Sequence, residues 1–258
     1  MTNAGMRVTI LGTGTSQGVP VVGCRCRVCK SNDSRDKRLR TSVLIQTPSS
    51  TVVIDAGPDF RQQMLGQLVE KLDAVLITHS HKDHTGGLDD VRAFNWIQKK
   101  PMDIFARATD LDSIKKEFAY AFEKDKYPGV PDILLHTIDG QPLSINGLGI
   151  IPIHAMHHKM PVFGFRIGDF SYLTDANSIE DKELDKMKGS KVVVINALRQ
   201  EKHISHFTLD EATEIIRYLK PERGYITHIS HQMGLHSEVQ DLLPPGVFLA
   251  WDGLQEIL

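Results

Sequence analysis

A short run rich in histidine is the strongest chemical signal in this sequence. It contains His79, His81, Asp83 and His84 and directly follows an apolar segment at residues 74–77. Alternate side chains of an extended segment share one face, so His79 and His81 can bind one ion. The chain then turns, and Asp83 and His84 can reach a second ion beside the first. Imidazole and carboxylate ligands suit zinc, manganese or iron, and the run therefore predicts a centre of two divalent metal ions.

A second group of candidate ligands is formed by the three cysteines, Cys24, Cys26 and Cys29. Their odd number and tight spacing argue against a disulfide framework and favour a reducing compartment and metal ligation. A closed structural zinc site needs four ligands. The sequence has no fourth cysteine, so His231, three residues after His228, is the candidate. Three free thiols in a loop are the alternative.

The composition sets the class of protein. Hydrophobic residues make up 41% and charged residues 24% of the 258 residues, as in ordinary globular proteins. A formal net charge of -2 gives no global basic field, so a nucleic-acid partner is not expected, although the basic stretch at residues 25–40 could handle phosphate. No apolar stretch approaches the ~20 residues of a membrane helix, and residues 1–6 do not form a signal peptide. We therefore expect a cytoplasmic protein without a membrane partner.

The elements that must position these residues follow from apolar, β-branched runs that end in polar or glycine-rich turns. The expected strands are residues 7–11, 42–46, 52–55, 74–78, 150–153, 170–174, 191–195 and 224–227. The expected helices are residues 59–69, 110–122 and 208–219, the last with a capping box of Thr208 and Glu211. Pro152 favours a sheet edge for its strand. We expect residues 99–135 to leave the core, and one α/β domain over residues 1–258.

The run at residues 79–84 resembles the signature of the metallo-β-lactamase superfamily. This resemblance implies an αββα sandwich and further site residues, each at the end of an apolar strand. Asp55 matches the first family motif, whose aspartate usually lies behind the metals as an orienting group. Asp175 matches the carboxylate that bridges the two ions, and His228 matches the last histidine ligand.

The third histidine ligand must lie between Asp83 and Asp175, where His154, His157 and His158 compete. Similar proteins carry this histidine a few residues before a Phe-Gly-aromatic strand, here residues 163–165. That spacing favours His157, then His158, then His154. The resemblance therefore implies His79, His81 and His157 on one ion, Asp83, His84 and His228 on the other, and Asp175 between them.

The cysteines narrow the resemblance to one branch, the phosphoribosyl cyclic phosphate phosphodiesterases of the carbon–phosphorus lyase pathway. Those proteins carry a cysteine-rich loop after the first strand and close a structural zinc with a histidine near the last metal-site histidine. Cys24, Cys26, Cys29 and His231 fit that pattern. The resemblance spans nearly the whole chain and also implies a homodimer.

Catalysis needs further groups. Two cations a few ångströms apart can share a hydroxide at neutral pH and neutralise charge on a phosphoryl oxygen. The leaving alkoxide needs a proton, and His206 is the candidate donor because it precedes the helix at residues 208–219, whose free N–H groups favour anions. His206 also resembles part of a motif of phosphodiesterase members, and His203 is its rival. We assign Asp83 a catalytic as well as a ligand role, and Arg199 is a candidate for binding substrate phosphate.

These residues predict a phosphodiesterase that hydrolyses a small, cyclic phosphodiester such as phosphoribosyl 1,2-cyclic phosphate. One alternative is a tRNA 3′-processing endonuclease of the RNase Z type, although no glycine- and proline-rich arm for gripping tRNA is evident. Another is hydrolysis of a thioester, lactone or β-lactam on the same fold, against which the His206 motif argues. The same scaffold hosts many reactions, so fold alone cannot choose among them.

Overall fold

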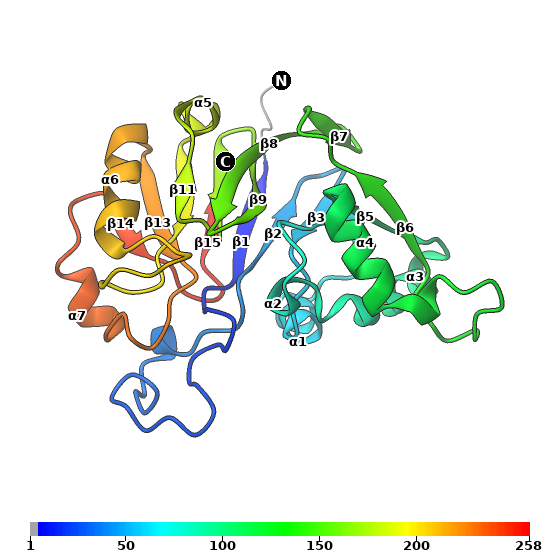
Figure 1. Ribbon diagram of the computed structural model, residues 1–258, viewed down its shortest axis with the longest axis horizontal. Coiled ribbons are helices and arrows are strands. Elements are labelled where there is room, and N and C mark those ends of the chain that lie inside the picture. Colours follow the sequence, from blue (N-terminus) through cyan, green and yellow to red (C-terminus); the bar gives the residue numbers. More distant parts are fainter. Residues whose placement is uncertain (1–4) are drawn as a thin grey trace.

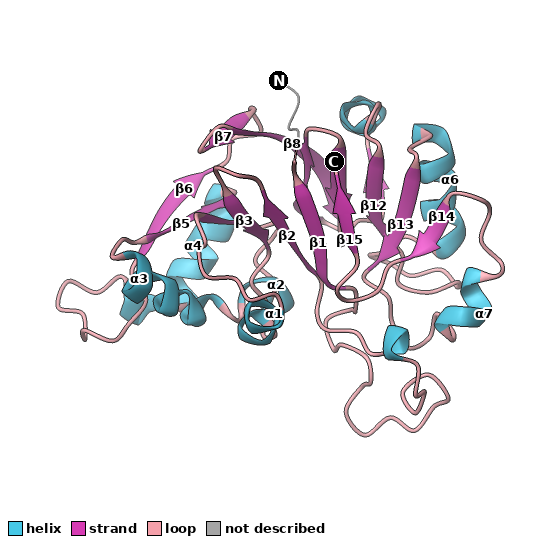
Figure 2. Cartoon of the chain, turned by 180° about the vertical axis from the view of Figure 1, so that it is seen from behind, coloured by secondary structure: helices cyan, strands magenta, loops and turns pink. Residues whose placement is uncertain are grey.

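Several strands are apolar at consecutive positions, which predicts sheets that are covered on both faces. In the computed structural model, which describes residues 5–258, two β-sheets pack face to face with helices on both outer sides (Figures 1 and 2). This is the αββα sandwich that the resemblance implies. Residues 1–4, part of the segment in which we expect no signal peptide, lie outside the described residues.

The first sheet has seven strands in the order β15-β1-β2-β3-β4-β5-β6. Their bounds are β15 (Gln255–Ile257), β1 (Arg7–Gly12), β2 (Ser42–Gln46), β3 (Thr51–Ile54), β4 (Ala74–Leu76), β5 (Met102–Ala106) and β6 (Ile133–Thr137). Strands β1 to β3 form an antiparallel meander, whereas β3 to β6 are parallel. The parallel strands end at one edge of the sheet, and the histidine run follows β4 there.

The second sheet has eight strands, seven of them in the order β11-β8-β9-β10-β12-β13-β14 and an eighth, β7, paired with β8. Their bounds are β11 (Ser178–Ile179), β8 (Leu148–His157), β9 (Met160–Ile167), β10 (Phe170–Leu173), β12 (Val192–Asn196), β13 (Arg223–Thr227), β14 (Val247–Leu249) and β7 (Leu143–Ile145). Strands β10, β12, β13 and β14 are parallel. Asp175 and His228 follow two of these strands.

The alternation of side chains along each strand builds three apolar layers. Val43 of β2 faces the second sheet, whereas its neighbour Leu44 faces the helices of the first sheet. In the same way Val192 packs between the sheets and Val193 packs against the helices of the second sheet. Full burial of such a side chain contributes about 1.5–3 kcal/mol, so both sheets are held in place from both faces.

Helices cover each sheet on its outer face. Helices α1 (Phe60–Gly66), α3 (Arg92–Gln98) and α4 (Ala108–Glu117) pack on the first sheet, and α5 (Asp181–Leu184), α6 (Leu209–Leu219) and α7 (His236–Gln240) on the second. The short helix α2 (Lys82–Thr85) carries part of the histidine run, and 3-10 turns lie at Ser34–Asp36, Leu88–Val91, Ala119–Ala121 and Asp185–Met187. The capping box that starts α6 is confirmed. No helix among residues 5–258 has the length and apolar character that a membrane span requires.

The expectation that residues 99–135 leave the core is wrong. Strand β5 lies within this segment and β6 begins in it, and the two strands extend the first sheet beyond β4. Along β5 only alternate residues are fully buried, and Asp103 interrupts the apolar run, which made the strand resemble a loop. Helix α4 then packs Leu111 and Ile114 into the apolar layer outside the first sheet.

The strand containing Pro152 is longer than expected, but the region around Pro152 lies at an open stretch of edge. On that side β7 pairs only as far as Ile150, and β11 pairs only from Ala155. Side chains of the α5 region close the gap: Glu183 accepts from the His154 N–H at 2.7 Å, and Lys186 donates to the Pro152 carbonyl at 3.1 Å. A proline is tolerated there because no strand partner needs its missing N–H.

Candidate metal centre

The predicted ligands come from strand ends in both sheets. Asp55 directly follows β3 and His228 directly follows β13, while the histidine run follows β4 and Asp175 follows β10. The sheets are linked at this point by the Phe163 N–H of β9, which donates to the Thr78 carbonyl at 2.9 Å. The carboxyl ends of parallel strands are the usual place for a site in such folds.

Three of these strand-end residues have a left-handed backbone. The φ angles are 64° for Asp55, 53° for Asp175 and 56° for His228. Non-glycine residues adopt this region infrequently, and such strain concentrates at functional sites. The turn ends each strand abruptly and directs the side chain into the space between the strand ends.

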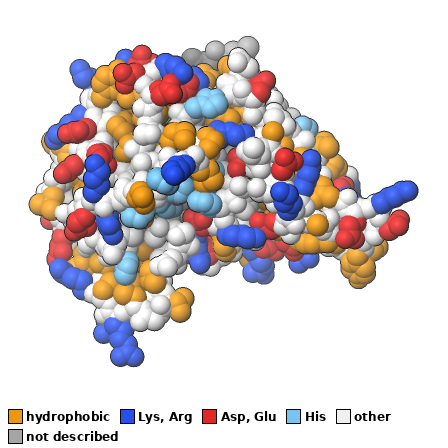
Figure 3. Space-filling model, in the orientation of Figure 1, with side chains coloured by type: hydrophobic (Ala, Val, Ile, Leu, Met, Phe, Trp, Pro, Cys, Tyr) orange, Lys and Arg blue, Asp and Glu red, His pale blue; other side chains and the backbone are white. Residues whose placement is uncertain are grey.

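The side chains meet in two adjoining groups. Ligand atoms of His79, His81 and His157 lie within 4.8 Å of one another, and so do those of a second set. The second set consists of Asp83, His84, Asp175 and His228. The rings of His79 and His84 connect the groups, with centroids 4.2 Å apart. Figure 3 shows histidine side chains gathered near the middle of this face of the molecule.

The structure favours His157 among the three competing histidines. His157 ends β8 and lies with the first group. His158 is exposed, and its backbone N–H donates to Asn177 Oδ1. The ring of His154 packs edge-on against Phe163 instead.

Asp55 and Thr78 form contacts that orient His84 within the cluster. The Asp55 carboxylate accepts from the Thr78 N–H at 2.8 Å and from its hydroxyl at 2.9 Å. Asp55 Oδ2 also lies 2.7 Å from His84 Nδ1 and is fully buried. A histidine bound at Nδ1 in this way presents Nε2 to the site, which is how the ring of a metal-binding histidine is usually oriented. Sequence reasoning assigned Asp55 this place but missed Thr78, although Thr78 directly precedes the run.

His157 is oriented in the same manner by the backbone. Its Nδ1 lies 2.8 Å from the Ser205 carbonyl, which leaves Nε2 to face His79 and His81. No sequence signal pointed to Ser205, because the acceptor is a main-chain atom 48 residues away along the chain.

Buried nitrogens without partners show that the cluster suits cations. Within residues 5–258, His84 Nε2 and both ring nitrogens of His228 are buried and make no hydrogen bond. His84 Nε2 nevertheless lies 3.2 Å from oxygens of both Asp83 and Asp175, and His228 Nε2 lies 3.1 Å from Asp175. Buried polar atoms are rarely left unpaired, and converging nitrogen and oxygen atoms are the ligands of divalent metals. The residues present therefore fit a pair of such ions.

The electrostatics agree with this fit. Burial acts to raise the pKa of Asp175, but His228 and His84 outweigh it and hold the pKa well below its usual range. Burial acts to lower the pKa of His84, whereas Asp55, Asp175 and Asp83 raise it well above the ordinary value. Burial likewise opposes ionisation of Asp83, yet His84 and His228 keep its pKa well below normal. Asp83 and Asp175 are thus ionised, which is the form in which a carboxylate binds a metal ion.

His206 lies beside both metal groups. Ligand atoms of His206, His157 and Asp175 lie within 4.8 Å of one another, and the His206 ring stacks on His228 with centroids 4.8 Å apart. The side chain is buried, and within residues 5–258 its Nδ1 has no hydrogen-bond partner. Burial, followed by the charge of His228, lowers the pKa of His206 to about 3. Its ring is therefore neutral at pH 7, and a bound phosphate anion would raise that pKa.

Two other predicted residues, His203 and Arg199, lie outside the two metal groups. His203 Nδ1 contacts Ser205 Oγ at 3.3 Å, and burial lowers the pKa of His203. Arg199 donates to Gln232 Oε1 at 2.8 Å and to the Lys202 carbonyl at 3.0 Å. Arg199 thus holds its own loop against Gln232, and its contact with substrate stays a prediction.

The cysteine cluster also assembles as the spacing suggested. Sγ atoms of Cys24, Cys26 and Cys29 lie 3.3, 3.4 and 3.6 Å from His231 Nδ1. The Cys29 N–H lowers the pKa of Cys26 to about 6, while burial raises the pKa of Cys29 to about 11. Three sulfurs and one imidazole match the donor set of a structural zinc. Binding of zinc would deprotonate the cysteines that are still thiols. Figure 1 shows that the N-terminal loop carrying these cysteines projects from the body of the molecule.

Two glycines allow the close approach of backbone segments beside Asp83. A Cβ on Gly57 would lie 2.0 Å from the Asp83 carbonyl oxygen, and a Cβ on Gly87 would lie 2.1 Å from the Gly57 oxygen. Such approaches exclude any side chain, so the loop after β3 fits closely under Asp83.

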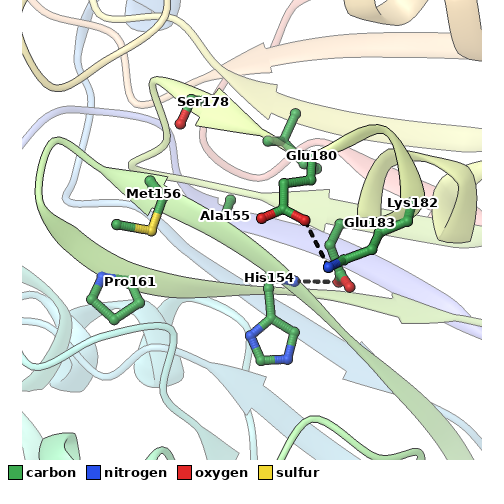
Figure 4. A pocket seen from close by; sticks show the side chains of 9 residues that line it. His154, Ala155, Met156, Pro161, Ser178, Glu180, Lys182 and Glu183 are labelled. Atoms are coloured by element: carbon green, nitrogen blue, oxygen red, sulfur yellow. Dashed lines mark hydrogen bonds and ion pairs between the residues drawn. The ribbon is translucent and has the colours of Figure 1, made fainter.

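A cavity of about 650 Å³ lies apart from both metal groups, between β8, β11 and α5. Figure 4 shows Glu180 and Glu183 on one side of it, while the ring of His154 points away from them. Glu180 pairs with Lys182 at 2.7 Å, and Glu183 pairs with Lys186 and the His154 N–H. Because these charges satisfy one another, the cavity offers little to a ligand.

Known proteins share this fold and much of this sequence. The family described as a beta-lactamase superfamily domain matches residues 50–229. A Porphyromonas gingivalis protein named octanoyltransferase is 41% identical over 256 residues, which make up 98% of this chain and 52% of that protein. The chain thus spans about half the length of that relative.

Two solved structures are similar over nearly their whole length. The crystal structure of a diphosphatase from the PhnP family is 37% identical, with a TM-score of 0.91 and coverage of 97% of both chains. The Zn²⁺-bound PqqB from Methylobacterium extorquens has a TM-score of 0.81 and covers 98% of this chain and 100% of its own. At 18% identity, the second structure shows a shared fold alone.

Proposed function

The chain belongs to the metallo-β-lactamase superfamily and is a metal-dependent hydrolase, and from this premise we propose that it hydrolyses a small phosphodiester. A cyclic ester such as phosphoribosyl 1,2-cyclic phosphate is the substrate we favour. The observation that carries this proposal is the place of His206, which lies with His157 and Asp175 and next to His228. A proton donor beside the metal groups can protonate the alkoxide leaving group.

The proposed ligands of one ion are His79, His81 and His157. Those of the other are Asp83, His84 and His228, with Asp175 shared. Two zinc or manganese ions held there would lower the pKa of a shared water and neutralise charge on the phosphoryl oxygens.

The protein's own residues supply the remaining steps. The hydrogen bonds from Thr78 fix Asp55, and Asp55 fixes the ring of His84, so the ligand set needs little rearrangement on binding substrate. In this proposal the ionised carboxylate of Asp83 accepts a hydrogen bond from the attacking water and orients it. His206 is neutral in the free site and becomes a proton donor once the phosphate anion raises its pKa.

A second candidate is hydrolysis of a diphosphate linkage. It is favoured by the PhnP-family relative, which is described as a diphosphatase and shares 37% of its sequence with this chain. The same cluster serves both reactions, because both require charge neutralisation at phosphorus and protonation of a leaving oxygen. The name of the Porphyromonas relative supports neither candidate, since this chain matches only about half of that protein.

Three wider expectations also remain proposals. The two sheets and their helices form one domain, the cysteine cluster functions in a reducing compartment such as the cytoplasm, and the protein assembles as a homodimer.

The test is a substrate panel on the purified, metal-loaded protein. We expect turnover of bis-p-nitrophenyl phosphate and of a ribose cyclic phosphate, little on a thioester, and no cleavage of precursor tRNA. Preference for ADP-ribose over the cyclic ester would favour the diphosphate reaction. Thioester hydrolysis without phosphodiester hydrolysis would overturn the proposal.

A further inference from the structure

Strand β4 ends just before the histidine run, and side chains bond to the backbone of the run instead of a neighbouring strand. The Ile77 N–H still donates to a carbonyl of β5 at 2.8 Å. Beyond it, the Thr78 N–H donates to Asp55 Oδ1, and Asp55 follows β3. The Ser80 N–H donates to Asp110 Oδ1 at 3.1 Å, and Asp110 lies in the first turn of α4, after β5. Carboxylates from the segments after both strands that flank β4 therefore hold the run.

Ser80 lies between His79 and His81, two of the proposed ligands of one ion. Nε2 of His79 lies 3.0 Å from Nδ1 of His81, and this convergence depends on the orientation of the peptides that join the two residues. His81 is exposed, and its carbonyl accepts from the N–H of His84 at 3.0 Å and from the hydroxyl of Thr85 at 3.2 Å. On the side toward His79, the backbone is held through the Ser80 N–H.

The Asp110 carboxylate has no other hydrogen-bond partner within residues 5–258. The side chain is 4% exposed, its Oδ1 accepts from Ser80, and its Oδ2 is buried without a partner. The guanidinium of Arg107 lies over the Phe163 ring at 4.4 Å, and its terminal nitrogens form no hydrogen bond with Asp110. Burial of a carboxylate that lacks a bonded partner charge costs free energy, so stability of the fold does not account for this residue.

We infer that Asp110 is a positioning residue of the metal centre, whose carboxylate fixes the peptide between His79 and His81 and so sets the spacing of these two ligands. The inference rests on the metal-binding part of the proposed function. Asp110 belongs to neither metal group, and it acts through the backbone of the run. Since Asp55 orients His84 of the neighbouring group, one buried carboxylate supports each group of ligands.

This role predicts opposite responses of metal binding and of stability when Asp110 is replaced. Leucine has nearly the branched shape of aspartate, and an apolar side chain in place of a buried charge is often neutral or stabilising. Ser80 is only partly buried, so its N–H can bond to water in the variant. The loss of an outer contact of this kind typically costs about 10–100-fold in metal affinity. Asp110→Leu should therefore weaken metal binding without lowering Tm.

The experiment removes Mn²⁺ from the metal-loaded protein with a chelator and follows the released ion by electron paramagnetic resonance. Mn²⁺ suits carboxylate ligands, whereas thiolates select softer ions, so the titration reports on this centre and not on the cysteine cluster. We expect Asp110→Leu to bind Mn²⁺ roughly 10–100-fold more weakly than the wild-type protein. Asp110→Asn keeps an oxygen for the Ser80 N–H and should restore the affinity. Asp112→Leu, at an exposed position of α4, is the matched control and should change nothing.

Wild-type Mn²⁺ affinity in Asp110→Leu would overturn the positioning role, and so would an Asp110→Asn variant that binds as weakly as Asp110→Leu. Asp110→Ala replaces the leucine variant if that one does not fold, and failure of both to fold would make Asp110 a structural residue and overturn the role. Turnover of bis-p-nitrophenyl phosphate by the wild-type protein tests the proposed function separately. Mn²⁺ binding that depends on Asp110, without this turnover, would retain the positioning role and lose the phosphodiesterase. Turnover with Mn²⁺ binding that does not depend on Asp110 would do the reverse.

Discussion

The two ligand clusters of this protein are built in opposite ways. The histidine and aspartate cluster comes from strand ends of two sheets, and His79, His84 and Asp175 are almost completely buried. The cysteine cluster comes from a projecting loop, and both Cys24 and Cys26 are only partly buried.

The difference lies in what holds each cluster together before a metal binds. Large apolar layers on both faces of the sheets fix the strand ends, so the first cluster is preformed by the core. The cysteine loop has a small apolar cluster centred on Val19, Val28 and Cys29. We propose that a loop with so little core is stabilised by a bound zinc ion, as small zinc-binding units are. Substitutions in the first cluster should therefore change chemistry, and those in the second should change stability.

The largest effect is expected for Asp175→Asn. This change removes the carboxylate that we propose is shared by the two ions and should lower kcat/KM roughly 10⁴-fold, since it removes several kcal/mol of charge stabilisation. Metal analysis should also show fewer than two ions at the centre. A variant that keeps two ions and near-normal kcat/KM would contradict the bridging assignment.

His206→Ala should lower kcat roughly 10³-fold, as expected for loss of a proton donor. Because His206 is not assigned as a ligand, the metal content should stay at the wild-type value. The matched change His203→Ala should have a much smaller effect on kcat. Loss of metal from the His206 variant would assign this residue a ligand role instead.

Asp55→Asn tests whether the contact between Asp55 and His84 orients the His84 ring for metal binding. An asparagine side chain has only one oxygen, so the variant loses either the bond from the Thr78 N–H or the contacts of Asp55 Oδ2 with the Thr78 hydroxyl and His84. A change at such a position typically costs about 10–100-fold in metal affinity or activity. Titration with a metal chelator followed by activity measurement checks this. An unchanged metal affinity would show that the His84 ring is held by packing alone.

The smallest effect on activity is expected for Cys26→Ser. The variant should lose one zinc per chain, keep the ions of the first cluster and retain kcat within about tenfold, while its Tm falls because the loop loses its bound ion. Metal stoichiometry and thermal unfolding measure both results. Loss of active-centre ions from this variant would show that the two clusters are not independent.

Much of the site was predictable because it is local in the sequence. The run at residues 79–84 follows an apolar strand, and strand-end polar residues such as Asp55 and Asp175 stand out beside buried neighbours. Strand β5 was missed for the opposite reason, since Asp103 interrupts a strand with only alternate buried residues. Thr78 and the Ser205 carbonyl were missed because a hydroxyl or a main-chain oxygen has no distinctive pattern in sequence.

The sequence by itself determined the donor atoms, their order along the chain and the strands that carry them. Only the tertiary structure decided that His157 rather than His158 joins His79 and His81, and that His231 meets cysteines 202 or more residues away. The physical reason is that neighbouring residues constrain secondary structure, whereas a choice between adjacent side chains depends on which face of β8 turns toward the other sheet. Contacts between distant loops likewise depend on how the two apolar layers pack, which no short segment specifies.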